Sequence, residues 1–245
     1  MKKTTLLFAG LAITALGATA QTADEIINKY ADALGGKKKL QTIKNIYMEG
    51  SVNAQGQQIP MKFWFVIKKS MRQEVTFNGM TQYTIVRNDS GWVFSPFQGQ
   101  KQAEPMTADQ VKSQQTELDV PGMELINYKE KGYKVTAQGK DNIDGTEVFK
   151  IEEVISDSLS QTYYIDPETY YVIRVHQKAT VNGKVENVNI DYSSYTKTAD
   201  GFVFPMSESI GGGDADDSGS EGGAVKFTTI KVNTDMDAKL FSPTK

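Results

Sequence analysis

The side chains that most often carry nucleophilic or metal chemistry are scarce in this chain. It has no cysteine and a single histidine, His176, which lies close to Arg174 on a predicted strand. Zinc sites built from several histidines and Cys-His nucleophile pairs are therefore excluded. A Ser-His-Asp triad would need His176, but no G-x-S-x-G turn precedes a helix. We interpret His176 as a half-exposed strand residue and expect a protein that is not an enzyme, with no catalytic residue, no metal and no cofactor.

Carboxylates are the remaining groups that could do chemistry. Glu152 and Glu153 are adjacent on a predicted strand, so their side chains point to opposite faces and make a poor acid–base pair. The acidic, glycine-rich segment 211–223 reads GGGDADDSGSEGG. Its carboxylates could bind calcium, although it lacks the residue order and flanking helices of an EF-hand. Its composition favours a flexible, solvated loop between two strands, and both interpretations stay open.

The first twenty residues have the pattern of a secretory signal peptide. Two lysines precede an apolar run at 6–16, and an Ala-Thr-Ala cleavage site ends at Ala20. The apolar run is too short to span a membrane. We therefore expect residues 1–20 to be removed and residues 21–245 to form a single exported domain. Because no cysteine is present to carry a lipid, we expect this domain to be an unanchored, monomeric periplasmic protein.

The charge of the chain limits its partners. The formal net charge is −3. Loss of the two signal-peptide lysines lowers it to about −5. A negatively charged protein is not attracted to phosphate backbones, so nucleic acid and anionic membrane surfaces are not expected as partners.

Two segments are predicted to be helical. The first begins with the capping box Thr22-Ala23-Asp24-Glu25, and its apolar residues recur at helical spacing as far as Leu34. Gly35-Gly36 ends it. The second, 107–118, also begins with a capping box, and Pro121-Gly122 follows it. Its apolar face is weak, so we expect it on the surface or across the mouth of a cavity.

The rest of the chain is predicted to be mostly β-structure. Turn pairs such as Asn78-Gly79 and Asp144-Gly145 separate runs with strand patterns, and they indicate hairpins. Because strands follow strands without intervening helices, the sheet is expected to be antiparallel. The predicted strands are 44–53, 59–68, 72–78, 80–87, 91–95, 133–139, 146–155, 161–166, 170–179, 184–195, 202–208 and 224–232.

Several predicted strands carry apolar residues on both faces, which is unusual for a sheet that faces water. The stretch 161–178, QTYYIDPETYYVIRVHQK, places two tyrosines before a turn and two after it. Phe63 and Phe65 share one face of their strand, while Trp64 lies on the other. Core packing accounts for most residues of this kind. A large curved sheet with helices inside it would also need an apolar concave face.

Four stretches together resemble the LolA-like outer-membrane lipoprotein-sorting proteins. They are the ALGG that ends the first helix, YYIDPETYYVIR, IDYSSYTKTADGFVFPMSESI and FTTIKVNTDMDAKLFSPTK. The resemblance covers nearly all of residues 21–245 and rests on loose patterns of hydrophobic and turn residues. It implies an α+β fold, mainly antiparallel β, in which an incomplete curved β-barrel, or half-barrel, has helices packed in its concave face as a lid.

In this family an apolar cavity between sheet and lid holds the acyl chains of a lipoprotein. The resemblance therefore implies a periplasmic carrier or chaperone for acylated lipoproteins or another lipid, with an inner-membrane donor complex and an outer-membrane receptor as partners. A non-enzymatic envelope interaction or sensor module with the same fold is the alternative. The cavity lining expected from strand parity and resemblance is Ile27, Tyr30, Leu34, Phe63, Phe65, Ile67, Phe77, Trp92, Phe94, Tyr163, Ile165, Tyr171 and Ile173.

The chain departs from the family pattern at one position that bears on the lid. The best-known carriers have an arginine followed by a proline after the strand that corresponds to 61–67, and this arginine bears on lid closure and release. Here the sequence is Lys68-Lys69-Ser70. A lysine can still bond to lid carbonyls, although it lacks the planar fork of arginine. Lys68 and Lys69 are therefore the candidate residues for lid closure and release.

Overall fold

A computed structural model describes residues 21–54, 56–115, 118, 123–181, 183–213 and 223–243. The predicted signal peptide, 1–20, and most of the acidic segment 211–223 lie outside these residues. The cleavage of the former and the calcium or loop character of the latter therefore stay predictions.

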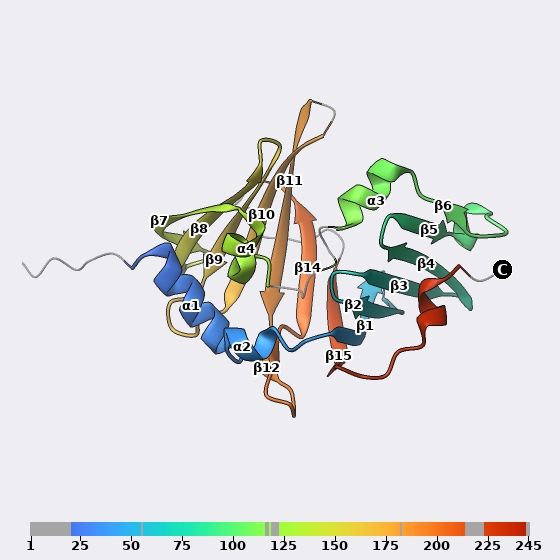
Figure 1. Cartoon of the computed structure of the whole chain (residues 1–245), viewed down its shortest axis with the longest axis horizontal. Helices are drawn as coiled ribbons and strands as arrows, with labels where there is room; N and C mark the ends of the chain where they lie inside the picture. Colours follow the sequence, from blue (N-terminus) through green and yellow to red (C-terminus); the bar gives the residue numbers. More distant parts are fainter. Residues whose placement is uncertain are drawn as a thin grey trace, which may run out of the picture.

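Thirteen strands of the described chain form one antiparallel sheet, in the order β6-β5-β4-β3-β2-β1-β15-β14-β11-β10-β9-β8-β7 (Figure 1). The edge strands β6 and β7 do not pair with each other, so the sheet is not closed into a barrel. This confirms the expected incomplete curved antiparallel barrel. The strands are β1 (Asn45–Ala54), β2 (Gln57–Val66), β3 (Ser70–Phe77), β4 (Met80–Arg87), β5 (Ser90–Phe94), β6 (Glu104–Pro105), β7 (Lys134–Ile143), β8 (Thr146–Ser156), β9 (Leu159–Ile165), β10 (Val172–Val181), β11 (Lys184–Ser193), β14 (Ser207–Gly212) and β15 (Ala224–Val232).

Short helices and one small ladder complete the described structure. The strands β12 (Thr196–Lys197) and β13 (Val203–Phe204) pair with each other outside the large sheet. Because β15 pairs with β1, strands from the two ends of the described chain lie side by side in the middle of the sheet. The helices are α1 (Ala23–Ala33), α2 (Lys37–Leu40), α3 (Ala108–Gln115) and α4 (Tyr128–Lys131), with the 3₁₀ turns η1 (Pro96–Gln98), η3 (Leu125–Asn127) and η4 (Ala238–Phe241).

The sheet has an inner face, which we define as the face that packs against α1. Its residues follow the pairing register from strand to strand, so that Ile46 lies opposite Phe65 and Ile151 lies opposite Tyr163. These side chains join the largest apolar cluster of the protein together with the buried residues of α1 and η3. In Figure 1, α1 and α4 lie in front of β7 to β10, and α3 lies over the other half of the sheet.

The opposite face, the outer face, has apolar clusters of its own. At β2 to β5 the C-terminal residues Leu240 and Phe241 pack against Tyr83 and Ile85. The guanidinium of Arg72 donates to the carbonyl oxygen of Leu240 at 2.9 Å, which ties η4 to the sheet. These contacts explain why β2 is apolar on both faces, because each face is covered by a different segment of the chain.

The predicted elements agree with the structure in most places. The strand predicted at 80–87 has these bounds in the structure, as does the one at 224–232. The strand predicted at 202–208 is instead two, β13 and β14, and the one predicted at 133–139 continues to Ile143. The short strands β6 and β12 and the helical segment of η3 and α4 were not predicted, because two to four residues carry no readable periodicity.

Candidate functional site

The first helix supplies the main cover of the inner face. Its capping box forms as expected, with the backbone N–H of Glu25 donating to the Thr22 hydroxyl and the Thr22 N–H donating to the Glu25 carboxylate. Both Ile27 and Tyr30 are at least 97% buried. Satisfied amides at the helix start and one apolar stripe explain why this segment is a helix that lies on the sheet.

A second helical segment, η3 followed by α4, lies beside α1. Leu125 and Ile126 are buried in the inner-face cluster, while the following turn, Tyr128–Lys131, is half-buried or exposed. Gly132 ends α4 in the left-handed conformation, with φ of 74°. A glycine in this position is a common helix-ending signal, and it is the one local signal by which this unpredicted helix could have been found in the sequence.

Polar contacts fasten the two helical segments together. The carboxylate of Asp24 accepts a bond of 2.8 Å from the Lys129 ammonium and one of 2.6 Å from the Tyr128 hydroxyl. The bond from Lys129 lowers the pKa of Asp24, with a smaller contribution from Tyr128. On the other side of α1, the Lys29 ammonium donates to the hydroxyl of Tyr170 at 2.9 Å. These polar contacts are exposed and can break at low cost, whereas the buried apolar residues of α1 and η3 hold the cover on the sheet.

We expect an Asp24→Asn variant to loosen this cover. Losing the charge weakens the bond to Lys129, so amides of α4 should exchange with solvent about twofold faster, a small effect because the pair is exposed. The matched control is Asp32→Asn, which changes an exposed carboxylate on the same helix. Because the pKa of Asp24 is lowered, the wild-type advantage should be present near neutral pH and disappear as the pH falls through that pKa. Equal exchange in the wild type and both variants at neutral pH would contradict this role.

The tyrosines on either side of the 166–169 turn have separate partners. Tyr163 lies on the inner face and Tyr164 on the outer face, and both are buried. Tyr170 has φ of 58° and stacks against Phe149 beneath α1. Tyr171 stacks on Tyr195, with ring centroids 4.2 Å apart. Three of the four therefore belong to the inner-face cluster, which explains the unusual doubling in the sequence.

A buried carboxyl group lies on this apolar inner face. Glu153 is fully buried, and its Oε2 lies 3.0 Å from the hydroxyl of Tyr163. That hydroxyl also lies 2.6 Å from Oε1 of Gln161. Burial raises the pKa of Glu153, although the bond from Tyr163 opposes the shift. Glu152, its neighbour, is half-buried on the outer face and accepts a bond from Gln138, so the two carboxylates do not form a pair.

The proton count of this group agrees with a protonated Glu153. The Tyr163 hydroxyl has one hydrogen, so it cannot donate to Glu153 and to Gln161 at the same time. If Glu153 is protonated, it donates to Tyr163, and Tyr163 donates to Gln161. The Gln161 amide then donates to Oε1 of Gln177 at 3.1 Å, which continues the chain across three strands.

A pocket of about 180 Å³ opens where α2, the β2–β3 turn and η3 meet. Its apolar wall consists of Leu40, Ile43, Ile67 and Met123, and its polar wall consists of Gln41, Lys68, Asn127 and Glu130. Asn127 is 92% buried, and its Oδ1 has no hydrogen-bond partner among the described residues. This volume is below the range of about 300–1,000 Å³ that is typical of ligand pockets.

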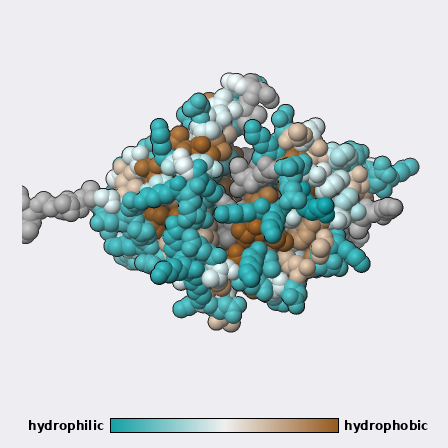
Figure 2. Space-filling model, in the orientation of Figure 1, coloured by the Kyte–Doolittle hydropathy of each residue, from teal (hydrophilic) through white to brown (hydrophobic). Residues whose placement is uncertain are grey.

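Part of the inner face is left uncovered by α1, α3 and α4. Glu208 and Ile210 of β14 share this face with Tyr192 and Ile190, their partners on β11. Ile210 is 54% exposed. Figure 2 shows apolar surface in the centre of this view, between the half that carries α1 and α4 and the half that carries α3. Among the described residues, Ile210 therefore leaves part of the inner face without a helix over it.

No family model matches the sequence, and no curated protein matches it. Solved structures do match. A LolA superfamily protein from Nitrosomonas europaea is 14% identical, with a TM-score of 0.55 over 91% of this chain and 98% of that chain. A putative outer membrane lipoprotein-sorting protein domain from Vibrio parahaemolyticus is 14% identical, with a TM-score of 0.51 over 90% and 97%. A DUF1329 family protein from Desulfovibrio piger is 11% identical, with a TM-score of 0.50 over 90% and 97%.

The chain has a LolA-like fold. The alignments carry this assignment because they cover at least 90% of this chain and 97% of each matching chain, while the low identity limits it to the fold. Within the described residues, no helix is long and apolar enough to cross a membrane. The described residues also contain no group of three or more His, Cys, Asp or Glu side chains that could hold a metal ion.

Nine of the predicted lining residues come together in the inner-face cluster of this LolA-like sheet. Those on α1 and on the strands β2 and β9 are either buried or half-buried there, and Tyr171 joins them through Tyr195. Phe65 also contacts a smaller cluster around Met71, which α3 covers. The nine are Ile27, Tyr30, Leu34, Phe63, Phe65, Ile67, Tyr163, Ile165 and Tyr171.

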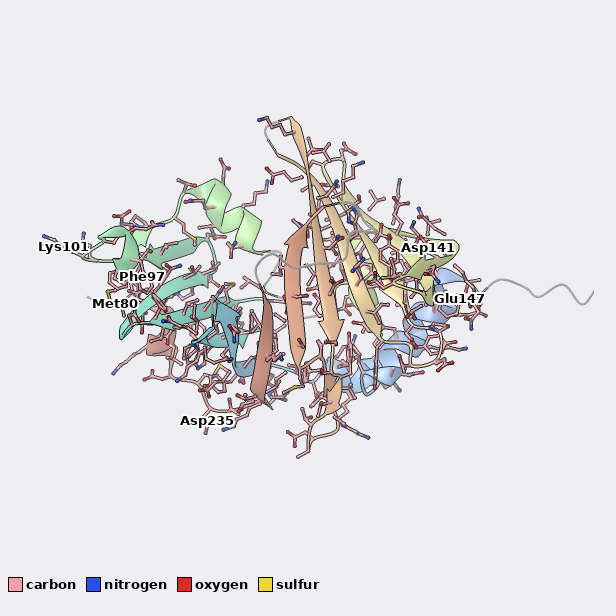
Figure 3. All side chains as sticks on the ribbon, turned by 180° about the vertical axis from the view of Figure 1, so that it is seen from behind. Met80, Phe97, Lys101, Asp141, Glu147 and Asp235 are labelled. Carbon is pink, nitrogen blue, oxygen red and sulfur yellow. The ribbon has the colours of Figure 1, made fainter. Side chains whose placement is uncertain are left out.

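The structure places the other four predicted lining residues elsewhere. Trp92 and Phe94 pack with η4 on the outer face, because they lie opposite Ile85 and Tyr83 in the register. Ile173 packs with Tyr164 on the outer face, next to a register shift at the start of β10 that strand parity alone does not reveal. Phe77 contacts Phe97 at the far end of the sheet, where Figure 3 shows Phe97 beside Met80.

The two candidate lid lysines lie in the turn between β2 and β3. Lys68 has φ of 60°, and its backbone N–H donates to the carbonyl oxygen of Leu118 at 2.8 Å. The Lys68 side chain lines the pocket and forms no ion pair among the described residues. Lys69 does not line the pocket, and its carbonyl oxygen accepts a bond from Asn88. A role for either lysine in release stays a proposal.

The remaining residues considered for chemistry have structural partners. The Nδ1 of His176 lies 2.8 Å from Oδ1 of Asn189, and His176 is half-buried on a strand, as expected. Arg174 is 98% buried on the outer face, where its guanidinium donates to Asp191 and lies 3.6 Å from Asp144. The residues that sequence reasoning missed are Asn127, Gln161 and Glu208, because an isolated polar residue in an apolar stretch has no local signature.

Proposed function

We propose that this protein is a periplasmic carrier that shields the acyl chains of lipoproteins, or of another lipid, between the inner face of the sheet and the helices that cover it. The observation that carries the proposal is the inner face itself. Apolar side chains of β1, β2 and β15 and of β8 to β11 line it, and it is covered by α1 and η3, whose buried apolar residues are supplemented by exposed polar contacts. Acyl chains would contribute ~0.8 kcal/mol per buried CH₂ group.

The comparisons support this proposal through fold alone. One matching structure is described as a putative outer membrane lipoprotein-sorting protein domain, and this chain shares its fold along almost the full length. The signal peptide expected at 1–20 would place the domain in the periplasm, where such a carrier would meet an inner-membrane donor complex and an outer-membrane receptor. Transfer of this kind needs no catalytic group, only a lid that opens and a receptor that binds better.

A large part of the inner face is filled by side chains of α1 and η3, and this sets a condition on the carrier. The pocket of about 180 Å³ is too small for a long acyl chain, so the helices must move away from the sheet during loading. Figure 1 shows that α1 and α4 lie on the surface of the molecule. The same filled interior favours the second candidate function, a non-enzymatic envelope interaction or sensor module.

Native mass spectrometry separates the two candidates. The mature protein is purified gently from its own periplasm, and co-purifying lipid is extracted and identified. The carrier proposal predicts a bound lipid or acylated peptide in near-stoichiometric amount. An unliganded protein that also fails to take up an acylated peptide in solution would instead support the interaction module.

A further inference from the structure

The pocket at the β2–β3 turn has features that general packing does not explain. Protein interiors are close-packed, and buried polar groups nearly always have a hydrogen-bond partner. Here Oδ1 of Asn127 is buried, lacks a partner among the described residues, and belongs to a side chain that lines an open space of about 180 Å³. An unsatisfied buried acceptor beside such a space indicates a missing hydrogen-bond donor.

The charges around the pocket point to the second part of a ligand. The carboxylate of Glu130 lies 3.3 Å from the ammonium of Lys37, which balances its charge. Lys68 has no such partner among the described residues, although its backbone is fixed by the bond to Leu118. A cation at the rim of a pocket that no described residue neutralises attracts an anionic group.

The size and walls of the pocket select a small head group attached to an apolar chain. Its volume corresponds to about six water molecules at their share of liquid volume, which is room for a few heavy atoms and not for a lipid tail. Ile67 and Met123 line the pocket and are also part of the inner-face cluster that contains Phe65. A chain that leaves the pocket past these residues would continue directly onto the apolar inner face.

We propose that this pocket binds the polar end of an acylated amphiphile that carries both an amide N–H and an anionic group. The N–H donates to Oδ1 of Asn127, the anion lies beside the ammonium of Lys68, and the acyl chain runs between the helices and the inner face. This inference rests on the proposed carrier function and names the head group that the carrier selects.

A matched set of three probes tests the head group on the unmodified protein. N-palmitoylglycine has the N–H and the carboxylate, N-palmitoylsarcosine has an N-methyl group in place of the N–H, and N-palmitoylglycinamide has a neutral amide in place of the carboxylate. Isothermal titration should show N-palmitoylglycine binding about fivefold more tightly than N-palmitoylsarcosine, as expected for one hydrogen bond to a buried acceptor. It should also bind more tightly than the glycinamide, by a factor that decreases with salt.

Two variants assign these preferences to their residues. Asn127→Leu should bind N-palmitoylglycine and N-palmitoylsarcosine equally, and Lys68→Gln should lose the preference for carboxylate over amide. Lys69→Gln is the matched control, because it removes the neighbouring charge from the same turn without changing the pocket wall. Urea unfolding of each variant checks that the fold is retained, and the comparison of probes on the wild type does not depend on any variant folding.

The outcomes separate this inference from the proposed function. If all three probes bind with equal affinity, the carrier proposal stands and the head-group site is overturned, with Asn127 bonded to water instead. If none of the probes binds, both the carrier proposal and the head-group site are overturned. Loss of discrimination in Lys69→Gln would also overturn the assignment to Lys68.

Discussion

Replacing Phe65 with glutamate is expected to abolish acyl-chain uptake while the sheet stays folded. Phe65 is half-buried on the inner face, where it stacks with Phe63 and contacts both the cluster beneath α1 and the cluster beneath α3. It therefore lies where a chain passing between the two groups of helices must run. A carboxylate there would face the acyl chain and lose its hydration, which costs more than the chain gains from contact.

The measurement is uptake of a fluorescent palmitoylated peptide, with the expectation of at least about tenfold weaker binding, or ~1.4 kcal/mol. The matched control is Val154→Glu, which introduces the same side chain on β8 at a position where valine is 39% exposed. Val154 pairs with Ser160 on the outer face, so this variant should bind like the wild type. A second control, Phe65→Leu, keeps an apolar side chain and should retain most of the binding.

Two results would count against this assignment. Phe65→Glu that binds the peptide normally would show that the acyl chain does not pass Phe65. Phe65→Glu that fails to fold would show that this side chain belongs to a core that does not open, and it would favour the interaction module over the carrier.

The second large effect is expected at Glu153. A Glu153→Gln variant should have a free energy of unfolding about 1–3 kcal/mol higher than the wild type at pH 8. This range is the free energy that a buried polar group costs when it lacks part of its hydrogen bonds. Glutamine is neutral at every pH and matches glutamate in size, so it avoids the penalty of a buried carboxylate. Urea unfolding at pH 8 and at pH 4.5 measures the difference.

The pH dependence follows from the raised pKa of Glu153. The folded protein keeps a proton on this carboxyl group that the unfolded chain has already released. Wild-type stability therefore falls as the pH rises above the unfolded-state pKa and through the raised folded-state pKa. The wild type and Glu153→Gln should consequently be similar near pH 4.5 and differ at pH 8, with the variant more stable.

Glu152→Gln is the matched control for this prediction. It makes the same chemical change one residue away, at a half-buried position on the outer face, where the side chain of Gln138 is the partner. It should leave stability nearly unchanged at both pH values. If Glu153→Gln and Glu152→Gln behave alike, Glu153 is not protonated in the folded protein, and the proposed chain of bonds through Tyr163 is wrong.

A buried, protonated carboxyl group would also couple the helical cover to pH. When the helices leave the sheet, Glu153 becomes hydrated and its pKa falls toward the ordinary value, so opening releases a proton. Higher pH would therefore favour the open state and lower pH the closed state. In the carrier that we propose, loading and release of cargo would then respond to pH in the same range as the stability of the wild type.

Much of the architecture was predictable from local patterns in the sequence. The capping box at Thr22 and the apolar spacing that follows it predict α1 because both signals depend on neighbours a few residues apart. The hairpin at Asn78-Gly79 was equally clear, since few other residue pairs adopt the positive φ angles that both residues have in the structure. Strands that follow one another through such turns can only form an antiparallel sheet.

The candidate site was predictable only in part. Alternation along β2 placed Phe63 and Phe65 together correctly, because no bulge interrupts the pairing of β2 with β1 or β3. The same reasoning gave no information on which face of β5 meets the helices, so Trp92 and Phe94 were assigned to the inner face although η4 covers them from outside.

By itself, the sequence determined that zinc sites built from several histidines and cysteine nucleophiles are excluded. It also determined that the sheet is antiparallel and apolar on both faces, with a capped helix available to cover it. Only the tertiary structure decided which face each aromatic residue occupies, that Asn127 and Lys68 share a pocket, and that Glu153 is buried beside Tyr163. The physical reason is range. Capping, turns and alternation act between residues close in sequence, whereas a buried polar group or a pocket depends on segments that only folding brings together, such as α2, the β2–β3 turn and η3.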